Sequence, residues 1–370
     1  MPIRNAICLS IDSLQAGMLG PYGNAWIRTP EFDRLAAQSY LFDQAYACEP
    51  TLDAALAVWW SQGFPSGFST TLVTDDPFVA KHPSAAAFSV SHFVDLPIEV
   101  RRPAKDIEST QLAAFFARAI DQLTEIESGG HLWLHTRGMN GPWDAPLELR
   151  NQYADEEDPK PPSFTAPPNA LLHADYDPDE LLGITHAYAG QVSLLDACLG
   201  VFLAALDESP IAKDTLLLLI GARGFPLGEH LRVGECDAPL YNELTHIPFF
   251  VRYPDGSEAL NRSQAFVTHQ DVPRTLVDWL ARTYTLPTRD HLILRSKQDR
   301  AIRTPAWYLR ESDTSEGLKR ELYAKPGDRW EVNDVADRCA DVTAQLSEIL
   351  ASPPIDPLAP LPDALVTSFD

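Results

Sequence analysis

Three short stretches of the chain, each at the end of an apolar run, contain residue types that could do chemistry. They are residues 10–13, 133–137 and 219–224. In α/β proteins, binding and catalytic groups lie at the carboxyl ends of the strands. Asp12, in the first stretch, has the type and position of a metal ligand or a catalytic acid. Aspartate also caps helices and forms turns, so Asp12 alone leaves both interpretations open.

Apolar runs alternate with segments of helical periodicity through most of the chain. Strands are predicted at residues 6–11, 68–73, 132–135, 215–220 and 249–251, and helices at 30–39, 51–60, 109–127, 181–206 and 271–283. This alternation predicts a mainly parallel sheet with helices on both faces. The run of Asp, Glu and Pro at residues 151–180 predicts a surface excursion.

The pattern changes after about residue 300. Residues 306–309 and 321–324 have the pattern of a hairpin, and residues 340–350 that of a helix. We therefore predict an α/β core over residues 1–300 and a small α+β subdomain over 301–352. A loose, proline-rich tail is predicted over 353–370.

The charge balance restricts the class of ligand. The chain has 52 acidic and 29 basic residues, a formal net charge of −23. Such a protein repels nucleic acids and anionic membranes, so we predict neither as a partner. A small anionic ligand needs a local positive site. The acidity also has a simpler interpretation as a source of solubility.

The cysteines and the N-terminus predict a cytoplasmic protein. The number of cysteines is odd and their spacing is wide, which favours free thiols in a reducing compartment. They are Cys8, Cys48, Cys198, Cys236 and Cys339. The apolar run at residues 6–11 is too short for a signal peptide, and no apolar stretch reaches the ~18 residues of a membrane span.

A series of motifs, in order along almost the whole chain, resembles the sulfatases of the alkaline-phosphatase-like superfamily. The N-terminal motifs are SIDSL at 10–14, LGPYGN at 19–24, TPEFDRLA at 29–36 and FDQAY at 42–46. The later ones are HTRGMNGPW at 135–143, LGEH at 227–230, YNEL at 241–244, IPFFVR at 247–252, LY at 322–323 and NDV at 333–335. The resemblance implies a three-layer α/β/α core with a mainly parallel central sheet and a small C-terminal α+β subdomain.

The resemblance also implies a cofactor and a nucleophile. Sulfatases bind a divalent cation, usually calcium, and use a Cys or Ser matured to formylglycine, whereas related phosphoesterases use Thr or Ser. By resemblance, Asp12 is the first metal ligand and Ser13 stands where a second Asp, or a Thr or Ser, is found. Lys, His and Arg groups neutralise the ester oxygens, because a dianion-like transition state needs preorganised positive charge.

The nucleophile motif and the anion contacts depart from the family pattern. Residues 48–52 keep Cys-x-Pro but end in Leu52 instead of Arg, so formylglycine maturation is not expected. Cys48 and Thr51 remain candidate nucleophiles. Asn140 replaces a sulfate-contacting His, and residues 74–77, Thr-Asp-Asp-Pro, replace a Lys-Trp-His segment. The two acids there are interpreted as turn formers.

The metal site departs in the same direction. Ala222 stands where a late Asp ligand belongs, and Arg223 where a neighbouring His or Asn ligand belongs. A methyl group cannot coordinate a cation, and a guanidinium has no lone pair to give. We expect Arg223 to approach Asp12 and to take the place of the missing cation. In the alternative, Arg223 turns to solvent and Asp12 caps the next segment.

These departures predict a sulfatase-family protein that has lost hydrolysis and acts as a binding or regulatory pseudoenzyme. Asp12 and Ser13 are then a vestigial metal site without a cofactor, and Arg137 and Arg223 bind a small anion. His135 is interpreted as a structural histidine, with a catalytic acid as the alternative. One alternative function is an active sulfate or phosphate ester hydrolase with calcium or another divalent cation. Another is a structural protein partner of an active paralogue.

Overall fold

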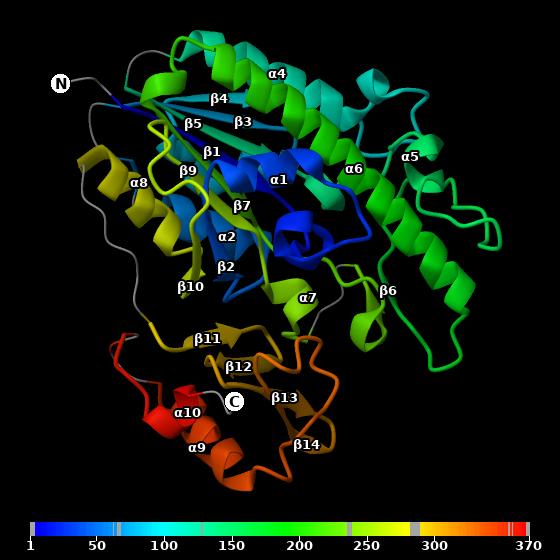
Figure 1. Ribbon diagram of the computed structural model, residues 1–370, viewed down its shortest axis with the longest axis vertical. Helices are drawn as coiled ribbons and strands as arrows, with labels where there is room; N and C mark the ends of the chain where they lie inside the picture. Colours follow the sequence, from blue (N-terminus) through cyan, green and yellow to red (C-terminus); the bar gives the residue numbers. More distant parts are fainter. Residues whose placement is uncertain are drawn as a thin grey trace.

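The computed structural model describes residues 4–61, 63–64, 68–126, 129–234, 239–281, 289–353, 356 and 358–367. It contains a large α/β core and a small antiparallel sheet with two helices near the C-terminus (Figure 1). This is the α/β/α architecture with a C-terminal α+β subdomain that the motifs predicted.

Eight strands form the central sheet in the order β10-β2-β9-β7-β1-β5-β3-β4. β9 runs antiparallel to β2 and β7, and the other neighbouring pairs are parallel. β1, β5 and β7 are buried along their whole length, as expected of central strands with helices on both faces. The strands are β1 (Asn5–Ile11), β2 (Tyr40–Tyr46), β3 (Ser69–Thr74), β4 (Val90–Phe93), β5 (Gly130–Thr136), β7 (Thr215–Gly221), β9 (Phe249–Arg252) and β10 (Arg262–Thr268).

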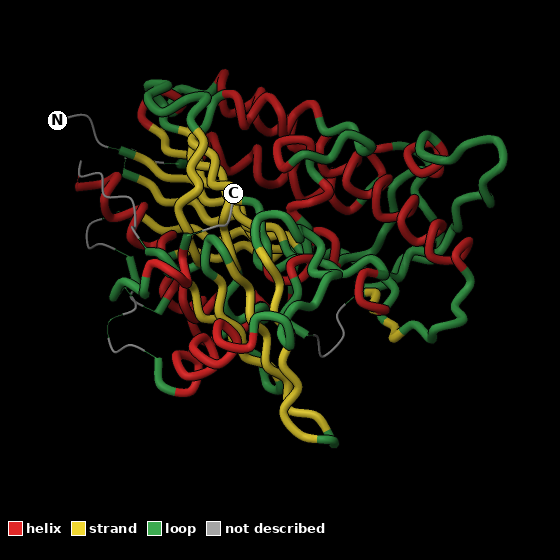
Figure 2. Tube along the Cα trace, turned by 60° about the horizontal axis from the view of Figure 1, so that its bottom comes forward, coloured by secondary structure: helices red, strands yellow, loops and turns green. Residues whose placement is uncertain are grey.

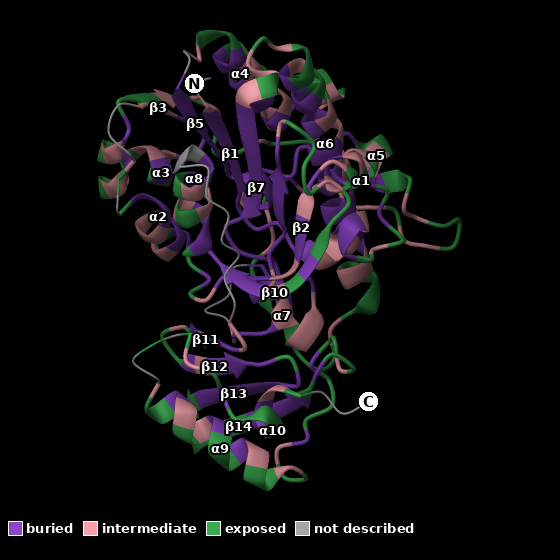
Figure 3. Cartoon of the chain, turned by 60° about the vertical axis from the view of Figure 1, so that its left-hand side comes forward, coloured by how far each residue is buried: buried purple, intermediate pink, exposed green. Residues whose placement is uncertain are grey.

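Alternate residues of each strand face the two helical layers. In β1, Ile7, Leu9 and Ile11 belong to one apolar cluster, and Ala6 and Cys8 to the other. The first cluster contains α1 (Pro30–Ala37), α4 (Gln111–Glu125) and α6 (Pro178–Glu208). The second contains α2 (Leu52–Trp60), α3 (Pro77–Lys81) and α8 (Asp271–Ala281). Figure 3 shows the sheet as the most deeply buried part of the core.

α6, which contains the helix predicted over residues 181–206, is largely apolar. By length and composition alone its 31 residues could cross a membrane, but 67% of its most apolar window is buried inside the protein. It packs against α1, α4 and α5 (Leu147–Asn151) as well as the sheet. A core helix with neighbours on several sides loses the clear polar face of a surface helix.

The C-terminal subdomain is a four-stranded antiparallel sheet with helices on its outer face (Figures 1 and 2). Its elements are β11 (Leu292–Arg295), β12 (Asp299–Arg303), β13 (Trp307–Thr314), β14 (Gly317–Ala324), α9 (Ala340–Ala351) and α10 (Asp363–Val366). The predicted hairpin is present in β13 and β14, and the predicted helix in α9. The sheet begins at Leu292, before the predicted boundary at residue 301.

The described part of the tail is not loose along its whole length. Leu361 and Leu365 are buried against the small sheet, and residues 363–366 form α10. The high proline content indicated a loose, extended chain. Burial of these two leucines instead holds this part of the tail against the small sheet. Residues 354–355, 357 and 368–370 lie outside the described part of the chain.

The remaining elements are short. α7 (Asn242–Thr245) precedes β9, and β6 (Ala170–Leu171) pairs with β8 (Arg232–Val233). Single 3₁₀ turns occur at η1 (Ala16–Met18), η2 (Gly20–Tyr22), η3 (Pro83–Ala87), η4 (Ile107–Ser109), η5 (Gly138–Asn140), η6 (Ala212–Asp214) and η7 (Glu229–Leu231).

Candidate functional site

The polar stretches predicted to carry chemistry meet at one edge of the central sheet. β1 pairs with β5 so that Ile11 lies opposite Thr136, and with β7 so that Ile11 lies opposite Gly221. β3 pairs with β5 so that Thr74 lies opposite His135. The residues that follow these strands therefore lie beside one another, because parallel strands end at the same edge.

Asp12 and Arg223 form a two-point ion pair at this edge. Arg223 donates from Nε to Asp12 Oδ1 and from Nη2 to Oδ2, each at 2.9 Å. Asp12 has no exposed surface and Arg223 is 6% exposed. The predicted contact is present, and the alternative in which Arg223 turns to solvent is wrong. A buried carboxylate is costly unless it is paired, and a planar guanidinium pairs with both oxygens at once.

The groups around Asp12 do not fit a divalent cation. Both Asp12 oxygens are bonded to Arg223, and Ala222 is a buried methyl group. Ser13, in a left-handed conformation with φ 57°, has its Oγ 3.4 Å from Asp12 Oδ1. Calcium takes six to eight oxygen ligands. Among the described residues, no group of three or more His, Cys, Asp or Glu side chains could hold a metal ion.

The backbone approaches Asp12 closely on its other side. Met139 N donates to Asp12 O at 3.0 Å, which ties η5 to the end of β1. Gly138 has φ 52°, and a Cβ at this position would lie 2.6 Å from Asp12 O. Only glycine combines that backbone conformation with so close an approach. This turn positions Arg137 and Asn140 on either side of the glycine.

Arg137 is held by Asp75, which the sequence analysis had interpreted as a turn former. Asp75 Oδ1 accepts from the Arg137 backbone N at 2.9 Å, and its Oδ2 is 3.5 Å from Arg137 Nε. Arg137 Nη2 also donates to Gln111 Oε1 at 2.7 Å. Burial raises the pKa of Asp75, and Arg137 opposes that rise. The sequence did contain a hint of this role, because Asp75 closely follows the strand predicted at residues 68–73 and so lies at the same edge of the sheet as Asp12.

Asp76 and His135 have structural contacts. Asp76 caps α3, where its Oδ1 accepts from Phe78 N at 2.8 Å. His135 has no exposed surface, and its Nδ1 is 2.9 Å from Ser10 Oγ. Burial lowers the pKa of His135, although Asp76, with Oδ2 4.0 Å from His135 Nε2, opposes the shift. A buried neutral imidazole that does not line a cavity is poorly placed to protonate a leaving group.

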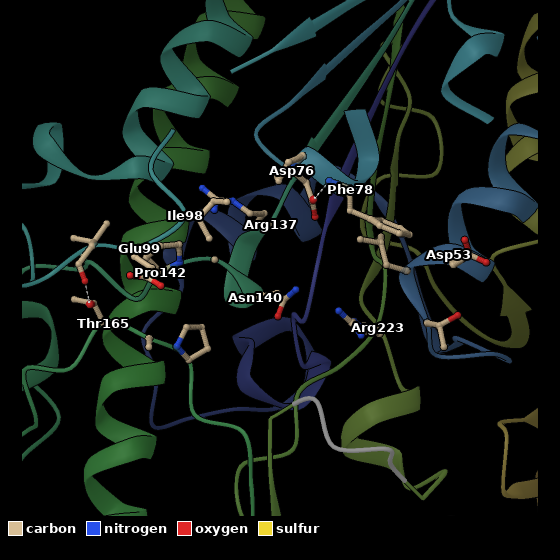
Figure 4. A pocket seen from close by; sticks show the side chains of 17 residues that line it. Asp53, Asp76, Phe78, Ile98, Glu99, Arg137, Asn140, Pro142, Thr165 and Arg223 are labelled. Atoms are coloured by element: carbon tan, nitrogen blue, oxygen red, sulfur yellow. Dashed lines mark hydrogen bonds between the residues drawn. The ribbon is translucent and has the colours of Figure 1, made fainter. Parts of the chain in front are cut away.

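A cavity of about 710 Å³ opens in front of the two arginines (Figure 4). Thr51, Arg137, Asn140 and Arg223 all line it, so the fold brings four of the predicted site residues together. Apolar side chains form much of its wall. They are Leu52, Pro77, Phe78, Ile98, Val100, Pro142, Ala166 and Pro167. Among the described residues, the Asn140 side chain makes no hydrogen bond within the protein.

Thr51 and Cys48 differ as nucleophiles. Thr51 is exposed, lines the cavity and caps α2, where its Oγ1 accepts from Ala54 N at 3.2 Å. Cys48 is half-buried, packs beside the apolar cluster between core and small sheet, and is not among the cavity-lining residues. Burial raises the pKa of the Cys48 thiol to about 12. A reactive cysteine needs the opposite shift.

A second cavity, of about 860 Å³, adjoins the first because Thr51 and Arg223 line both. Its far wall comes from the small sheet, which contributes Arg310 and Lys319. The cleft therefore extends from the edge of the central sheet to the C-terminal subdomain. Ser13, Thr51 and Arg223 of its lining were predicted site residues, whereas Arg310 and Lys319 were not.

Comparisons with known proteins agree with the fold and the motifs. The Sulfatase family model matches residues 61–282. A curated relative, the multifunctional alkaline phosphatase superfamily protein PehA of Trinickia caryophylli, is 31% identical over 111 residues. That match covers 29% of this chain and 21% of the relative, so the matched segment spans about a fifth of the length of PehA.

Solved structures share the fold over nearly the whole chain. The phosphonate monoester hydrolase of Agrobacterium radiobacter superposes with a TM-score of 0.72 at 17% identity, covering 94% of this chain and 95% of that one. BT4656, in complex with its substrate D-glucosamine-2-N,6-O-disulfate, has a TM-score of 0.74 at 14% identity, covering 94% and 97%. Members of this family generally use a divalent metal ion, for which the groups around Asp12 do not provide a fitting site. With the family model spanning more than half of its length, the chain belongs to the sulfatase family.

Proposed function

We propose that this protein is a sulfatase-family pseudoenzyme that binds a small acidic organic molecule in its cleft and does not hydrolyse esters. The observation that carries the proposal is the Arg223–Asp12 ion pair, which puts a fixed positive charge on the carboxylate that the resemblance identifies as the first metal ligand. A guanidinium cannot act as a Lewis acid or activate a water as a metal does. The pair therefore neutralises the buried Asp12 carboxylate, as a cation would, but it does not support ester hydrolysis.

The charges around the cavity favour a single negative charge on the ligand. Arg223 is paired with Asp12, and Arg137 lies against Asp75, so each positive charge is offset by a carboxylate. Asp53, Asp76 and Glu99 also line the cavity. They disfavour a dianion such as a phosphate monoester more than a monoanion such as a sulfate monoester or a carboxylate.

Donors and apolar surface are both available to such a ligand. Arg137 Nη1 and the Asn140 amide make no hydrogen bond to the described part of the chain and line the cavity, as Figure 4 shows. Phe78 and Ile98, which are exposed, offer apolar contact. The combination of apolar walls with a few polar groups is typical of small-molecule sites. The anionic sulfated substrate of BT4656 supports an acidic ligand.

The second candidate function is ester hydrolysis with Thr51 as the nucleophile. It is favoured by the position of Thr51, which is exposed in the cavity at the N-terminus of α2. The α2 dipole would stabilise negative charge on the Thr51 oxygen. This function also requires a base and a cation, and both oxygens of Asp12 are already bonded to Arg223.

Turnover assays separate the two functions. The purified full chain is assayed on aryl sulfate, aryl phosphate and aryl phosphonate esters with calcium, magnesium, manganese or zinc. We expect no turnover with any metal. Metal-dependent turnover that Asp12→Ala abolishes would establish the hydrolase and refute the pseudoenzyme.

Thermal shift measurements test the binding site directly. Phenyl sulfate and benzoate are expected to raise the melting temperature more than phenyl phosphate does. Arg137→Gln and Asn140→Ala should reduce that shift, whereas Arg101→Gln, an exposed arginine outside this cavity, should leave it unchanged. Equal shifts in all four proteins, or none in the wild type, would contradict the proposed ligand class.

A gain of metal binding tests the role of Arg223. Ala222→Asp combined with Arg223→Asn restores oxygen ligands beside Asp12. We expect calcium to stabilise this double variant against heat and to leave the wild type unaffected. Calcium stabilisation of the wild type that is lost in Asp12→Asn would show that the native residues already hold a cation.

A further inference from the structure

We infer that a second anion site, for a free tetrahedral oxyanion such as phosphate or sulfate, lies between the core and the C-terminal sheet. A cavity of about 280 Å³ is present at this junction. Core elements β2, α7 and β10 form one wall, and β12 with the loop after β14 forms the other. Figures 1 and 3 show α7 and β10 facing the small sheet here. This site is separate from the cleft of the proposed function.

The lining of this cavity is rich in positive charge although the chain as a whole carries −23. Its basic residues are Arg262, Arg303, Lys325 and Arg329, and Asp43 is the carboxylate among the described lining residues. Asp43 is bonded to Arg262 and to Gln264. Lys325 donates to Glu331 Oε1 at 2.8 Å and is neutralised by it. The guanidinium groups of Arg303 and Arg329 have no carboxylate partner among the described residues.

The strongest indication of a ligand is the side chain of Arg303, which is buried and unpaired within the described part of the chain. It is 7% exposed, and no described carboxylate lies within salt-bridge distance of it. Nε donates to the Tyr46 hydroxyl at 3.4 Å and Nη1 to Thr304 O at 3.2 Å. Nη2 has no hydrogen-bond partner in the described part of the chain, and the residue lines the cavity. A buried guanidinium stays charged, so its burial is costly without a counter-ion.

Besides burial, the positive charge of the cavity also lowers the pKa values of His246 and Lys325, which line it. The pKa of His246 is lowered to about 4, chiefly by burial, and the charges of Arg329 and Arg303 act in the same direction. Burial lowers the pKa of Lys325 as well; Glu331 opposes that shift and Arg303 adds to it. A cavity of this size, with donors from both walls and unbalanced positive charge, suits an oxyanion that accepts several N–H bonds.

Such an anion would join two parts of the protein. Arg303 belongs to the small sheet, and Arg329 reaches back to the core, where Nη2 donates to Tyr22 O at 2.8 Å. Tyr46 and His246 complete the core side of the cavity. Bound phosphate or sulfate would therefore stabilise the junction of core and subdomain, away from Asp12 and Arg137.

Isothermal titration of the full chain with sodium phosphate and sodium sulfate, at constant ionic strength, tests the site. We expect one site of millimolar or better affinity. Arg303→Gln should weaken binding at least about tenfold, as expected for the loss of charged hydrogen bonds. Arg329→Gln, at an exposed residue, should weaken it in the same direction and provides the test if Arg303→Gln does not fold. Arg338→Gln, exposed and outside the cavity, is the charge-matched control.

The same titration separates this site from the cleft. Arg137→Gln should leave phosphate and sulfate binding unchanged, and Arg329→Gln should leave the phenyl sulfate shift unchanged. The inference is overturned if the wild type binds neither oxyanion at millimolar concentration. It is also overturned if Arg329→Gln binds them as tightly as Arg338→Gln does, or if Arg137→Gln is the variant that loses them.

Discussion

Asp12 and Arg223 are 211 positions apart in the chain, and their side chains meet in a two-point ion pair with almost no solvent exposure. Replacing one partner leaves an uncompensated buried charge. We expect Arg223→Met to lower the free energy of unfolding by about 3–5 kcal/mol, and Asp12→Asn with Arg223→Met to recover much of that loss. Urea unfolding of the three proteins measures both effects.

An exposed ion pair provides the control for this prediction. Arg34 lies 2.7 Å from Glu31, and 36% of its side chain is exposed. Arg34→Met is expected to cost less than about 1 kcal/mol, because solvent screens surface pairs. If Arg223→Met costs no more than Arg34→Met, the Asp12 site has another source of compensation.

At the scale of an element, a buried histidine on β5 makes the stability of the protein depend on pH. His131 and Trp133 lie on the same face of the strand with parallel rings, and Phe64 packs on His131 with ring centroids 4.5 Å apart. Burial lowers the pKa of His131 to about 3. In the unfolded chain, His131 therefore binds a proton below about pH 6.5. In the folded chain it binds this proton only below about pH 3.

Because the pKa of His131 is lowered by folding, the free energy of unfolding should decrease as the pH falls. The stabilising contribution of His131 is complete above about pH 6.5 and is lost progressively as the pH falls toward about 3. His131→Phe keeps a ring and removes the titration. The free energy of unfolding of the wild type should fall by about 2 kcal/mol more than that of His131→Phe between pH 7 and pH 5. Parallel pH profiles would contradict it.

Elements also differ in how well their sequences predicted them. Central strands β1 and β7 are buried throughout and mostly apolar, because both faces are covered, and their apolar runs were recognised. β2, β4 and β10 lie toward the edges of the sheet and contain polar residues, so no apolar run marked them. In the small sheet, β11 and β12 were missed because they are short and polar in part.

At the scale of the whole molecule, a polar network connects the small sheet to the core. Arg310 on β13 lies 2.8 Å from Asp299 and is bonded to Glu321, and its Nη2 donates to the Tyr241 hydroxyl at 2.9 Å. The Arg310 guanidinium also lies over the Tyr241 ring, 4.4 Å from its centroid. Tyr241 precedes α7 of the core, so this network holds the two parts together.

Arg310→Met should therefore weaken the junction. Because Arg310 is 6% exposed, its loss leaves Asp299 buried without a counter-charge among the described residues and leaves Glu321 with Lys319 alone. We expect a loss of about 3–5 kcal/mol in the free energy of unfolding. Arg320→Met removes a half-exposed arginine paired with Glu311 and should cost less, because Arg300 still pairs with Glu311. Equal unfolding midpoints for the two variants would rule out this role of the network.

The sequence alone determined the family resemblance, the α/β/α class and the presence of an alanine and an arginine at positions 222 and 223, because these depend on local composition and motif order. It also indicated which strand ends to examine. The ion pair expected from the residue types could not be established that way. Its existence depends on the strand order β5-β1-β7, which brings residues 12 and 223 to one edge.

Tertiary structure alone decided which charges are paired and which are not. The contact of Asp75 with Arg137, the raised pKa of the Cys48 thiol and the unpaired Arg303 all depend on burial and on neighbours distant in sequence. A side chain gains or loses a compensating partner only when strand register and packing bring the two together. Desolvation, which makes that partner necessary, also exists only in the folded core.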